Sequence, residues 1–251
     1  MIMAALCSGA AWGAGPFYSA EGIVKNGNWA PGPFAPNSVV TIFGSGLARS
    51  AYALTATDIH DHTLPNELNY TRVYLDNEAA PLFFVSEGQI NFLSPSRHAT
   101  GNAVLRVVRE GLVGPVVSIA IVDAAPGLFA LSTGFAIASH RDFTLVAPET
   151  PAHAGETIVL WATGLGKTAQ NPATGEIPQY VSPIALFGDL RVFLNGTMLD
   201  PASIVYAGLT PQSAGLYQVN FTLPETLPED PEIRISMGSQ STPTGLKIAV
   251  R

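Results

Sequence analysis

The sequence is poor in cysteine and in charge. Cys7 is the single cysteine among 251 residues, which excludes a disulfide within the chain because that bond needs two thiols. Lys, Arg, Asp and Glu make up only 12%, about half their share in an average globular protein. Uncharged polar side chains and backbone must therefore cover much of the surface, as in extracellular β proteins and in proteins that assemble. Hydrophobic residues, at 47%, suffice for a core.

Clusters of positive charge are also missing. The 12 Lys and Arg residues are scattered, and the net charge is −7 with a pI near 5.1. Binding to nucleic acid depends on several cations that face phosphates, and binding to anionic membranes depends on basic segments. We therefore expect neither a nucleic acid nor an anionic membrane as a partner.

Long hydrophobic runs are absent as well. Met1–Gly15 is apolar and rich in small residues, but it is too short to span a bilayer. It resembles the end of a secretory signal peptide, with Ala11–Gly13 as a small-x-small cleavage signal, although no basic segment precedes it. We therefore expect residues 1–15 to be a signal segment that carries Cys7 away. The expected location is secreted or at the cell surface, without a transmembrane span.

Short β-strand patterns fill the rest of the chain. Runs rich in Val, Ile, Phe, Thr and Tyr alternate with turn residues, and 24 Gly and 20 Pro leave no room for long helices. A single helical turn is expected near Ala51–Thr57. The predicted strands are Val39–Phe43, Arg72–Leu75, Gln89–Leu93, Ala103–Val108, Val116–Val122, Thr157–Ala162, Arg191–Leu194, Tyr217–Leu223, Glu232–Met237 and Leu246–Val250.

Three motifs occur twice in the same order, which indicates an internal duplication. The pairs are Ser38–Leu47 with Glu156–Leu165, Arg72–Asn77 with Arg191–Gly196, and Gln89–Phe92 with Gln218–Phe221. The spacing within the last pair exceeds that of the others by about ten residues. We therefore predict an insertion in the second copy around Ala207–Gly215.

The repeat predicts an all-β protein of two tandem immunoglobulin-like β-sandwiches. Such a module needs about 100 residues, so the predicted boundaries are 16–124 for the first half and 125–251 for the second half. The linker Asp123–Gly127 is a short Pro-Gly joint, which should hold the two halves close together.

Several longer motifs carry a family resemblance. They are the Gly-Ser-Gly-Leu run at 44–47, Ala80–Phe92, Ala125–Phe129, Ala162–Gly166, Tyr206–Leu209 and Gly215–Asn220. From about Gly22 to the end, the chain resembles an uncharacterised C-terminal domain of secreted, Solibacter-type (Acidobacteria) proteins, which has no assigned activity. Each half is also similar, more loosely, to IPT/TIG immunoglobulin-like domains through an opening that resembles Pro-x-x-x-hydrophobic-Thr-Ile-x-Gly-x-Gly-Leu. The resemblance implies a secreted accessory module that often follows other domains.

Each copy contains a Gln-x-Asn pair, Gln89 with Asn91 and Gln218 with Asn220. Residues two apart on a strand share a face, so these amides project away from the core that Ile90 and its neighbours fill. They could form an amide ladder for sugar hydroxyls, or they could satisfy nearby loop backbone. Because a structural brace is needed in every copy and a ligand site only once, we favour the structural interpretation.

Asp58, His60 and His62 form the one metal-like cluster. Imidazole and carboxylate groups suit Zn or Cu, but a structural site needs about four ligands, and a polar surface loop is the competing interpretation. No cofactor is expected elsewhere.

Catalytic patterns are lacking. There is no Gly-x-Ser-x-Gly elbow, the histidines at 98, 140 and 153 are isolated, and the carboxylates lie beside turns. We therefore expect no catalytic residue.

Aromatic side chains and one loop are the remaining candidates for ligand contact. Trp161 aligns with Phe43, so we expect it in the core, whereas Trp29 and Tyr217 are expected to be exposed. The insertion Ala207–Gly215 is a candidate because binding residues favour loops. The expected ligand-binding residues are Trp29, Gln212, Ser213 and Tyr217.

Together these features predict a non-enzymatic extracellular module for adhesion, for surface or matrix assembly, or for accessory binding of polysaccharide or protein. Uncharged strand edges would also permit self-assembly by strand addition. The alternatives are a secreted hydrolase or metal-dependent enzyme using His60 and His62, and a structural spacer.

Overall fold

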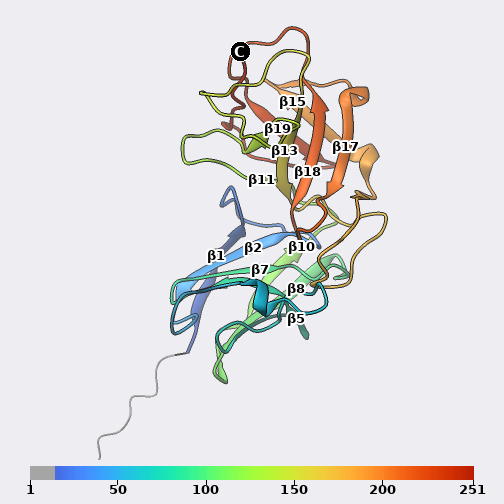
Figure 1. Ribbon diagram of the computed structural model, residues 1–251. Helices are drawn as coiled ribbons and strands as arrows, with labels where there is room; N and C mark the ends of the chain where they lie inside the picture. The colour runs from blue at the N-terminus through green and yellow to red at the C-terminus, as the bar shows by residue number, and fades with distance from the viewer. Residues whose placement is uncertain (1–14) are drawn as a thin grey trace, which may run out of the picture.

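The computed structural model describes residues 15–251, and Figure 1 shows them as two β-sandwiches stacked end to end. The predicted signal segment with Cys7 lies outside the described residues, apart from Gly15. Among the described residues there are four antiparallel sheets and three short 3-10 turns, without an α-helix. None of these helical turns is long and apolar enough to cross a membrane. The all-β, two-sandwich prediction is confirmed.

The first half packs a sheet of order β1-β2-β7-β6-β3 against a sheet of order β10-β8-β4-β5, with β9 paired to β8. The strands are β1 (Phe17–Lys25), β2 (Val39–Ser45), β3 (Tyr52–Ala53), β4 (Thr71–Leu75), β5 (Glu78–Ala80), β6 (Leu82–Val85), β7 (Gln89–Leu93), β8 (Gly101–Arg109), β9 (Leu112–Val113) and β10 (Val117–Ile121).

The second half packs a sheet of order β11-β13-β18-β17-β14, with β12 paired to β13, against a sheet of order β16-β15-β19-β20. The strands are β11 (Gly127–Leu128), β12 (Ala138–Ser139), β13 (Thr157–Thr163), β14 (Ser182–Pro183), β15 (Leu190–Leu194), β16 (Thr197–Met198), β17 (Ile204–Leu209), β18 (Tyr217–Thr222), β19 (Ile233–Met237) and β20 (Gln240–Ser241).

The two halves share one topology down to a register shift. β2-β7-β6-β3 in the first half corresponds to β13-β18-β17-β14 in the second. In the first half the register shifts between Leu82 and Phe84, where β6 meets β7. In the second half it shifts between Ile204 and Tyr206, where β17 meets β18. A β-bulge at the equivalent place in both halves is what duplication predicts.

Alternating burial explains why these segments form strands. In β18, Val219 and Phe221 are fully buried, whereas Gln218 and Asn220 are partly exposed. The same alternation runs through β7, where Ile90 and Phe92 are fully buried. Burial of each large apolar side chain contributes roughly 1.5–3 kcal/mol, so a shift by one residue would expose the core set.

Three sequence-based boundaries need correction. Leu246–Val250 forms no regular strand, because its backbone pairs by isolated bridges with three separate places, at Phe135, Glu232 and Ala152. The helical turn expected at Ala51–Thr57 is a 3-10 turn at Ala56–Asp58. The predicted insertion Ala207–Gly215 begins inside β17, so the loop that follows this strand covers only residues 210–216.

A long connection between β13 and β14, residues 164–181, reaches from the second half onto the first (Figure 1). The Asn171 side chain accepts a hydrogen bond from Asn37 Nδ2 at 2.9 Å and donates one to the Ser96 carbonyl at 2.9 Å. The Thr174 hydroxyl donates to the Glu78 carboxylate at 2.6 Å. Residues 164–181, named here the interdomain clasp, therefore fasten the two sandwiches together.

The base of the 210–216 loop also packs on the first half. The buried Thr163 hydroxyl accepts from the Val39 backbone N–H at 2.9 Å and donates to the Gly215 carbonyl at 3.0 Å. A Cβ on Gly215 would lie 2.6 Å from Leu93 Cδ1. The contacts of Thr163 with Val39 and of Gly215 with Leu93 cross from one sandwich to the other and hold the two halves in a fixed relation.

Candidate functional site

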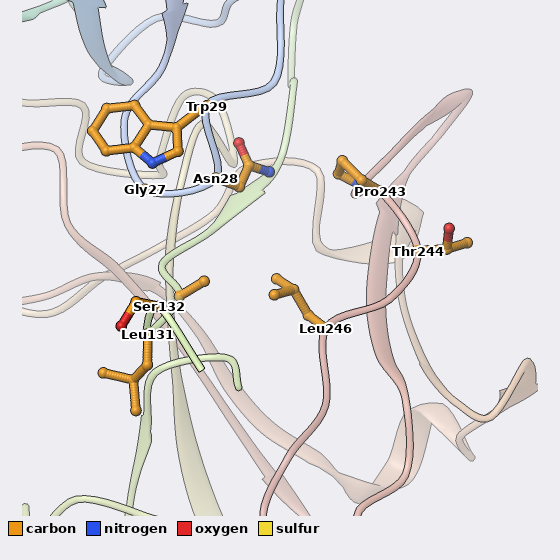
Figure 2. Close-up of a pocket in the computed structure, with 9 residues that line it drawn as sticks. Gly27, Asn28, Trp29, Leu131, Ser132, Pro243, Thr244 and Leu246 are labelled. Atoms are coloured by element: carbon orange, nitrogen blue, oxygen red, sulfur yellow. The ribbon is translucent and has the colours of Figure 1, made fainter. Parts of the chain in front are cut away.

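A cavity that combines an exposed aromatic ring with hydrogen-bonding groups lies between the two halves (Figure 2). Its volume is about 470 Å³. The 27–29 loop of the first half forms one side, and Figure 2 shows Leu246 pointing into the space below it. The lining residues are Gly27, Asn28, Trp29, Ala130, Leu131, Ser132, Pro243, Thr244 and Leu246.

The 27–29 loop owes its shape to a backbone that only certain residues tolerate. Gly27 has a φ of +105°, and a Cβ there would lie 2.6 Å from Phe129 Cδ1 in the second half. Trp29 has a φ of 55°, in the left-handed region that costs a bulky residue free energy. Its N–H donates to the Lys25 carbonyl at 3.1 Å. A strained tryptophan held in this way is a candidate for a functional position.

Trp29 presents its ring to solvent beside a second aromatic ring. Its side chain is 52% exposed, and its centroid lies 5.5 Å from that of Phe43, which is 40% exposed. The two rings meet at 54°. The predicted exposure of Trp29 is therefore confirmed. Phe43, which the sequence analysis placed in the core with Trp161, is exposed as well.

Phe43 and Trp161 correct the sequence analysis. Both occupy equivalent central-strand positions that face away from the core, with Phe43 opposite Gln89 and Trp161 opposite Gln218. Trp161 is partly exposed rather than buried. The alignment of Phe43 with Trp161 is correct, but the prediction that Trp161 lies in the core is wrong. Aromatic residues at equivalent strand positions also fit the outer face of a sheet.

The cavity is electrically neutral and contains a spare hydrogen-bond donor. None of its lining residues is charged. Asn28 Oδ1 accepts from the Ala30 N–H at 3.1 Å, whereas its buried Nδ2 has no partner among the described residues. Ser132 and Thr244 add exposed residues with hydroxyl groups. Burial lowers the pKa of Lys25, whose ammonium group does not line the cavity.

Tyr217 is wrong as an exposed ligand-binding residue. Its side chain is fully buried, and its hydroxyl donates to the Gly166 carbonyl inside the second half. Burial raises the pKa of its phenol. As the first residue of β18, it has the core-facing position of the alternation, so it holds the interdomain clasp to the core instead of meeting solvent.

Gln212 and Ser213 do not line the cavity near Trp29. The Gln212 N–H donates to the Pro178 carbonyl at 2.6 Å, and the Ser213 N–H donates to the Thr210 carbonyl at 3.2 Å. Their loop is tied to the interdomain clasp. Their role in ligand binding stays a prediction, separate from the cavity of Trp29.

The structure gives the Asp58–His62 segment no metal geometry. No three His, Cys, Asp or Glu side chains within residues 15–251 come close enough together to hold a metal ion. Asp58 accepts hydrogen bonds from Thr55 and Tyr52, which lower its carboxyl pKa. His60 and Thr63 close a tight turn, and the His62 carbonyl accepts from the Ile177 N–H at 2.7 Å. The segment is thus a docking point for the interdomain clasp.

The Gln-x-Asn pairs point to the outer face, as predicted. In the first half Gln89 Nε2 donates to Asn91 Oδ1 at 2.9 Å, and the Thr41 hydroxyl donates to the same oxygen at 3.0 Å. Thr41 in turn accepts from Asn26 Nδ2 at 3.0 Å. Gln218 and Asn220 line a different cavity in the second half.

Sequence reasoning missed most of the residues around Trp29. Asn28 belongs to the first half, whereas Leu131, Ser132, Thr244 and Leu246 come from two distant segments of the second half. No spacing rule connects these segments. The one available signal was the Gly27-Asn28-Trp29 turn, which places an aromatic residue at a loop tip.

No family model and no curated protein matches the chain. Among solved structures, the chain is similar to the surface glycan-binding protein SGBP-B from a xyloglucan utilization locus of Bacteroides uniformis. Identity is 11%, coverage is 92% of this chain and 49% of that one, and the TM-score is 0.26. The chain is also similar to the Bacteroides ovatus SGBP-B in complex with a mixed-linkage heptasaccharide. Identity is 10%, coverage is 95% of this chain and 47% of that one, and the TM-score is 0.34.

Domains 5–6 of the S-layer protein SbsC are also similar, with 9% identity, coverage of 94% and 98%, and a TM-score of 0.28. The chain spans about half the length of the two glycan-binding proteins. At these identities and TM-scores, the likeness carries no conclusion about the site.

Proposed function

We propose that this protein is a non-enzymatic, extracellular polysaccharide-binding module, and that neutral sugar residues bind in the cavity beside Trp29. The observation that carries the proposal is an uncharged cavity with a half-exposed indole ring and an unpartnered amide donor. Sugar rings have apolar C–H faces and polar hydroxyl edges. An aromatic face with a few fixed polar groups matches both parts.

Each part of the cavity has a distinct task in this proposal. The exposed face of Trp29 stacks on a sugar ring, and the contact of its indole with the Phe43 ring, at 5.5 Å between centroids, supports the indole from one side. Asn28 Nδ2 is buried without a partner among the described residues, and a turn of its side chain toward the cavity lets it donate to a sugar hydroxyl and ends the cost of an unsatisfied donor. Leu131 and Leu246 exclude water from the apolar side.

The rigid junction supports this assignment. Because both halves line the cavity, its shape depends on their relative position, which the interdomain clasp fixes. A site formed in advance loses less conformational entropy on binding than a flexible one. The low charge of the chain fits a neutral polysaccharide as well. Nothing in the geometry favours the alternative enzyme that uses His60 and His62.

Trp29→Ala tests the proposal. Isothermal titration calorimetry with soluble xyloglucan and mixed-linkage glucan should show binding by the unmodified protein. Loss of a central aromatic anchor typically costs about 2 kcal/mol or more, so Trp29→Ala should weaken binding at least about tenfold. The glycan should stay uncleaved throughout.

Phe17→Ala is the matched control, because Phe17 is 69% exposed and does not line the cavity. It should bind as the unmodified protein does. Equal affinity of Trp29→Ala and Phe17→Ala would rule out the cavity as the site, and cleavage of either glycan would rule out a non-enzymatic role.

A further inference from the structure

The outer face of the second half repeats the aromatic arrangement found around Trp29. Phe143, from the loop after β12, lies with its ring centroid 6.5 Å from that of Trp161, and its side chain is 70% exposed. Trp161 faces Gln218 across the β13–β18 ladder, just as Phe43 faces Gln89 in the first half. Both halves therefore place a loop aromatic, a strand aromatic and a Gln-x-Asn pair on one face.

The loop that carries Phe143 is held in a defined shape. The Phe143 N–H donates to the His140 carbonyl at 3.0 Å, and the His140 N–H donates to the Thr144 carbonyl at 2.9 Å. Asp142 accepts from the Thr144 N–H at 3.0 Å and from its hydroxyl at 2.7 Å. Phe143 itself has a φ of 68°, in the left-handed region that costs a bulky residue free energy.

One residue distinguishes the two amide pairs. In the first half Thr41 lies opposite Asn91 and donates to it. In the second half Val159 lies opposite Asn220 and has no hydroxyl to donate. Asn220 Oδ1 is accordingly buried without a partner among the described residues. The brace of the first half is thus incomplete in the second, where the Asn220 amide lacks the hydroxyl partner that Asn91 has.

A cavity of about 270 Å³ lies at this place. Arg141 supplies the one charged side chain among its described lining residues, and no acidic side chain of residues 15–251 pairs with it. The neighbouring Asp142 is occupied by Thr144. The lining residues are Arg141, Phe143, Thr157, Val159, Val205, Gln218 and Asn220.

We propose that this face is a second carbohydrate site, and that it binds a sugar residue bearing a carboxylate, such as a uronic acid. Phe143 stacks on the sugar ring, Gln218 and Asn220 bond its hydroxyls, and Arg141 pairs with its carboxylate. A guanidinium binds a carboxylate through two parallel hydrogen bonds. The ligand class rests on the proposed function, but the site shares no lining residue with the cavity of Trp29.

The test compares two forms of one polysaccharide in isothermal titration. Polygalacturonate presents free carboxylates, whereas its fully methyl-esterified form has the same backbone without charge. The protein should bind polygalacturonate at least about tenfold more tightly, because a charge-assisted pair is lost on esterification. Arg141→Gln should abolish this preference, and Phe143→Ala should weaken binding to both forms.

Arg97→Gln is the control, since Arg97 is an exposed arginine outside the cavity. Equal affinity for the two forms would overturn the carboxylate assignment, and unchanged binding in Phe143→Ala would overturn the site. Binding of xyloglucan measured in the same variants separates the two proposals. Arg141→Gln and Phe143→Ala should leave it intact, whereas Trp29→Ala should leave the polygalacturonate preference intact.

Discussion

Single residues decide which repeated features are structural. Asn91 and Asn220 occupy equivalent strand positions and share the same Gln two residues earlier. Thr41 completes a hydrogen-bonded chain in the first half, from Asn26 through Thr41 to Asn91. Val159 interrupts the equivalent chain in the second half. The structural interpretation of the amide pairs therefore describes the first half, and the second half differs by one hydroxyl group.

Thr41→Val should reveal the energetic value of that hydroxyl. The substitution keeps the size of the fully buried side chain but removes the donor to Asn91 and the acceptor for Asn26. We expect the free energy of unfolding to fall by about 1–2 kcal/mol, measured by urea denaturation.

The reciprocal change Val159→Thr supplies a donor opposite Asn220 and serves as the matched variant. It should leave stability unchanged or raise it by up to about 1 kcal/mol. A similar fall in the free energy of unfolding in both Thr41→Val and Val159→Thr would mean that steric fit, and not the hydrogen bond, determines the effect at these two equivalent positions.

At the scale of elements, the connections differ more than the strands do. The central strands of the two halves match in order and even in the position of a bulge. By contrast, β13 and β14 are separated by residues 164–181, whereas β2 and β3 are separated only by residues 46–51. The longer connection forms the interdomain clasp. Its contacts with Asn37, Ser96 and Glu78 are polar because connecting segments must satisfy their own backbone and side-chain groups.

Asn171→Ala should loosen this clasp. It removes the partner of the Asn37 side chain, which is 2% exposed, and the donor to the Ser96 carbonyl. Leaving a buried donor unsatisfied costs about 1–3 kcal/mol, which urea denaturation should detect. Gln179→Ala is the control, because the Gln179 side chain has, within residues 15–251, one hydrogen bond, to the Ile177 carbonyl of the same segment. Equal effects of the two substitutions would contradict a clasp centred on Asn171.

At the scale of the whole molecule, the junction between the sandwiches determines the candidate site. The cavity of Trp29 has walls from both halves, so it exists only while they keep their relation. That relation depends on close backbone approach at Gly215, near Leu93 and Val39 of the first half. The linker region contributes too, since Ala125 donates its N–H to the Gly164 carbonyl at 2.8 Å.

Gly215→Ala tests whether this close approach holds the halves together. Gly215 has a φ of +72°, and its added Cβ would lie 2.6 Å from Leu93 Cδ1 and 2.8 Å from Val39 Cγ2. Gly196 has a similar φ of +77°, but a Cβ added there would lie within 4 Å of no other part of the described chain. Gly196→Ala therefore measures backbone strain alone, about 1–2 kcal/mol. We expect Gly215→Ala to be the more destabilising in thermal unfolding and to weaken xyloglucan binding. Identical melting temperatures for Gly215→Ala and Gly196→Ala would show that the junction accommodates the added methyl group without loss of stability.

The sequence by itself determined the strands, because alternation with period two and frequent turn residues are local signals. Gln89–Leu93 is a strand as predicted, and the repeated motifs gave the two halves and the outward direction of the Gln-x-Asn pairs. The strand at Leu246–Val250 was wrong for the same reason: its apolar pattern is local, whereas its backbone partners lie in three distant segments.

Only the tertiary structure decided which residues from distant segments pack beside one another. The exposure of Trp161 depends on which face the partner sheet covers, because an aromatic residue fits either face of a strand. The burial of Tyr217, by contrast, follows from the alternation in β18, which places it on the same face as Val219 and Phe221. The neighbours of Trp29 come from segments at 130–132 and 243–246, and their approach follows from the packing of the two halves. The cavity forms from segments that are far apart in the sequence, so local sequence patterns could not predict it.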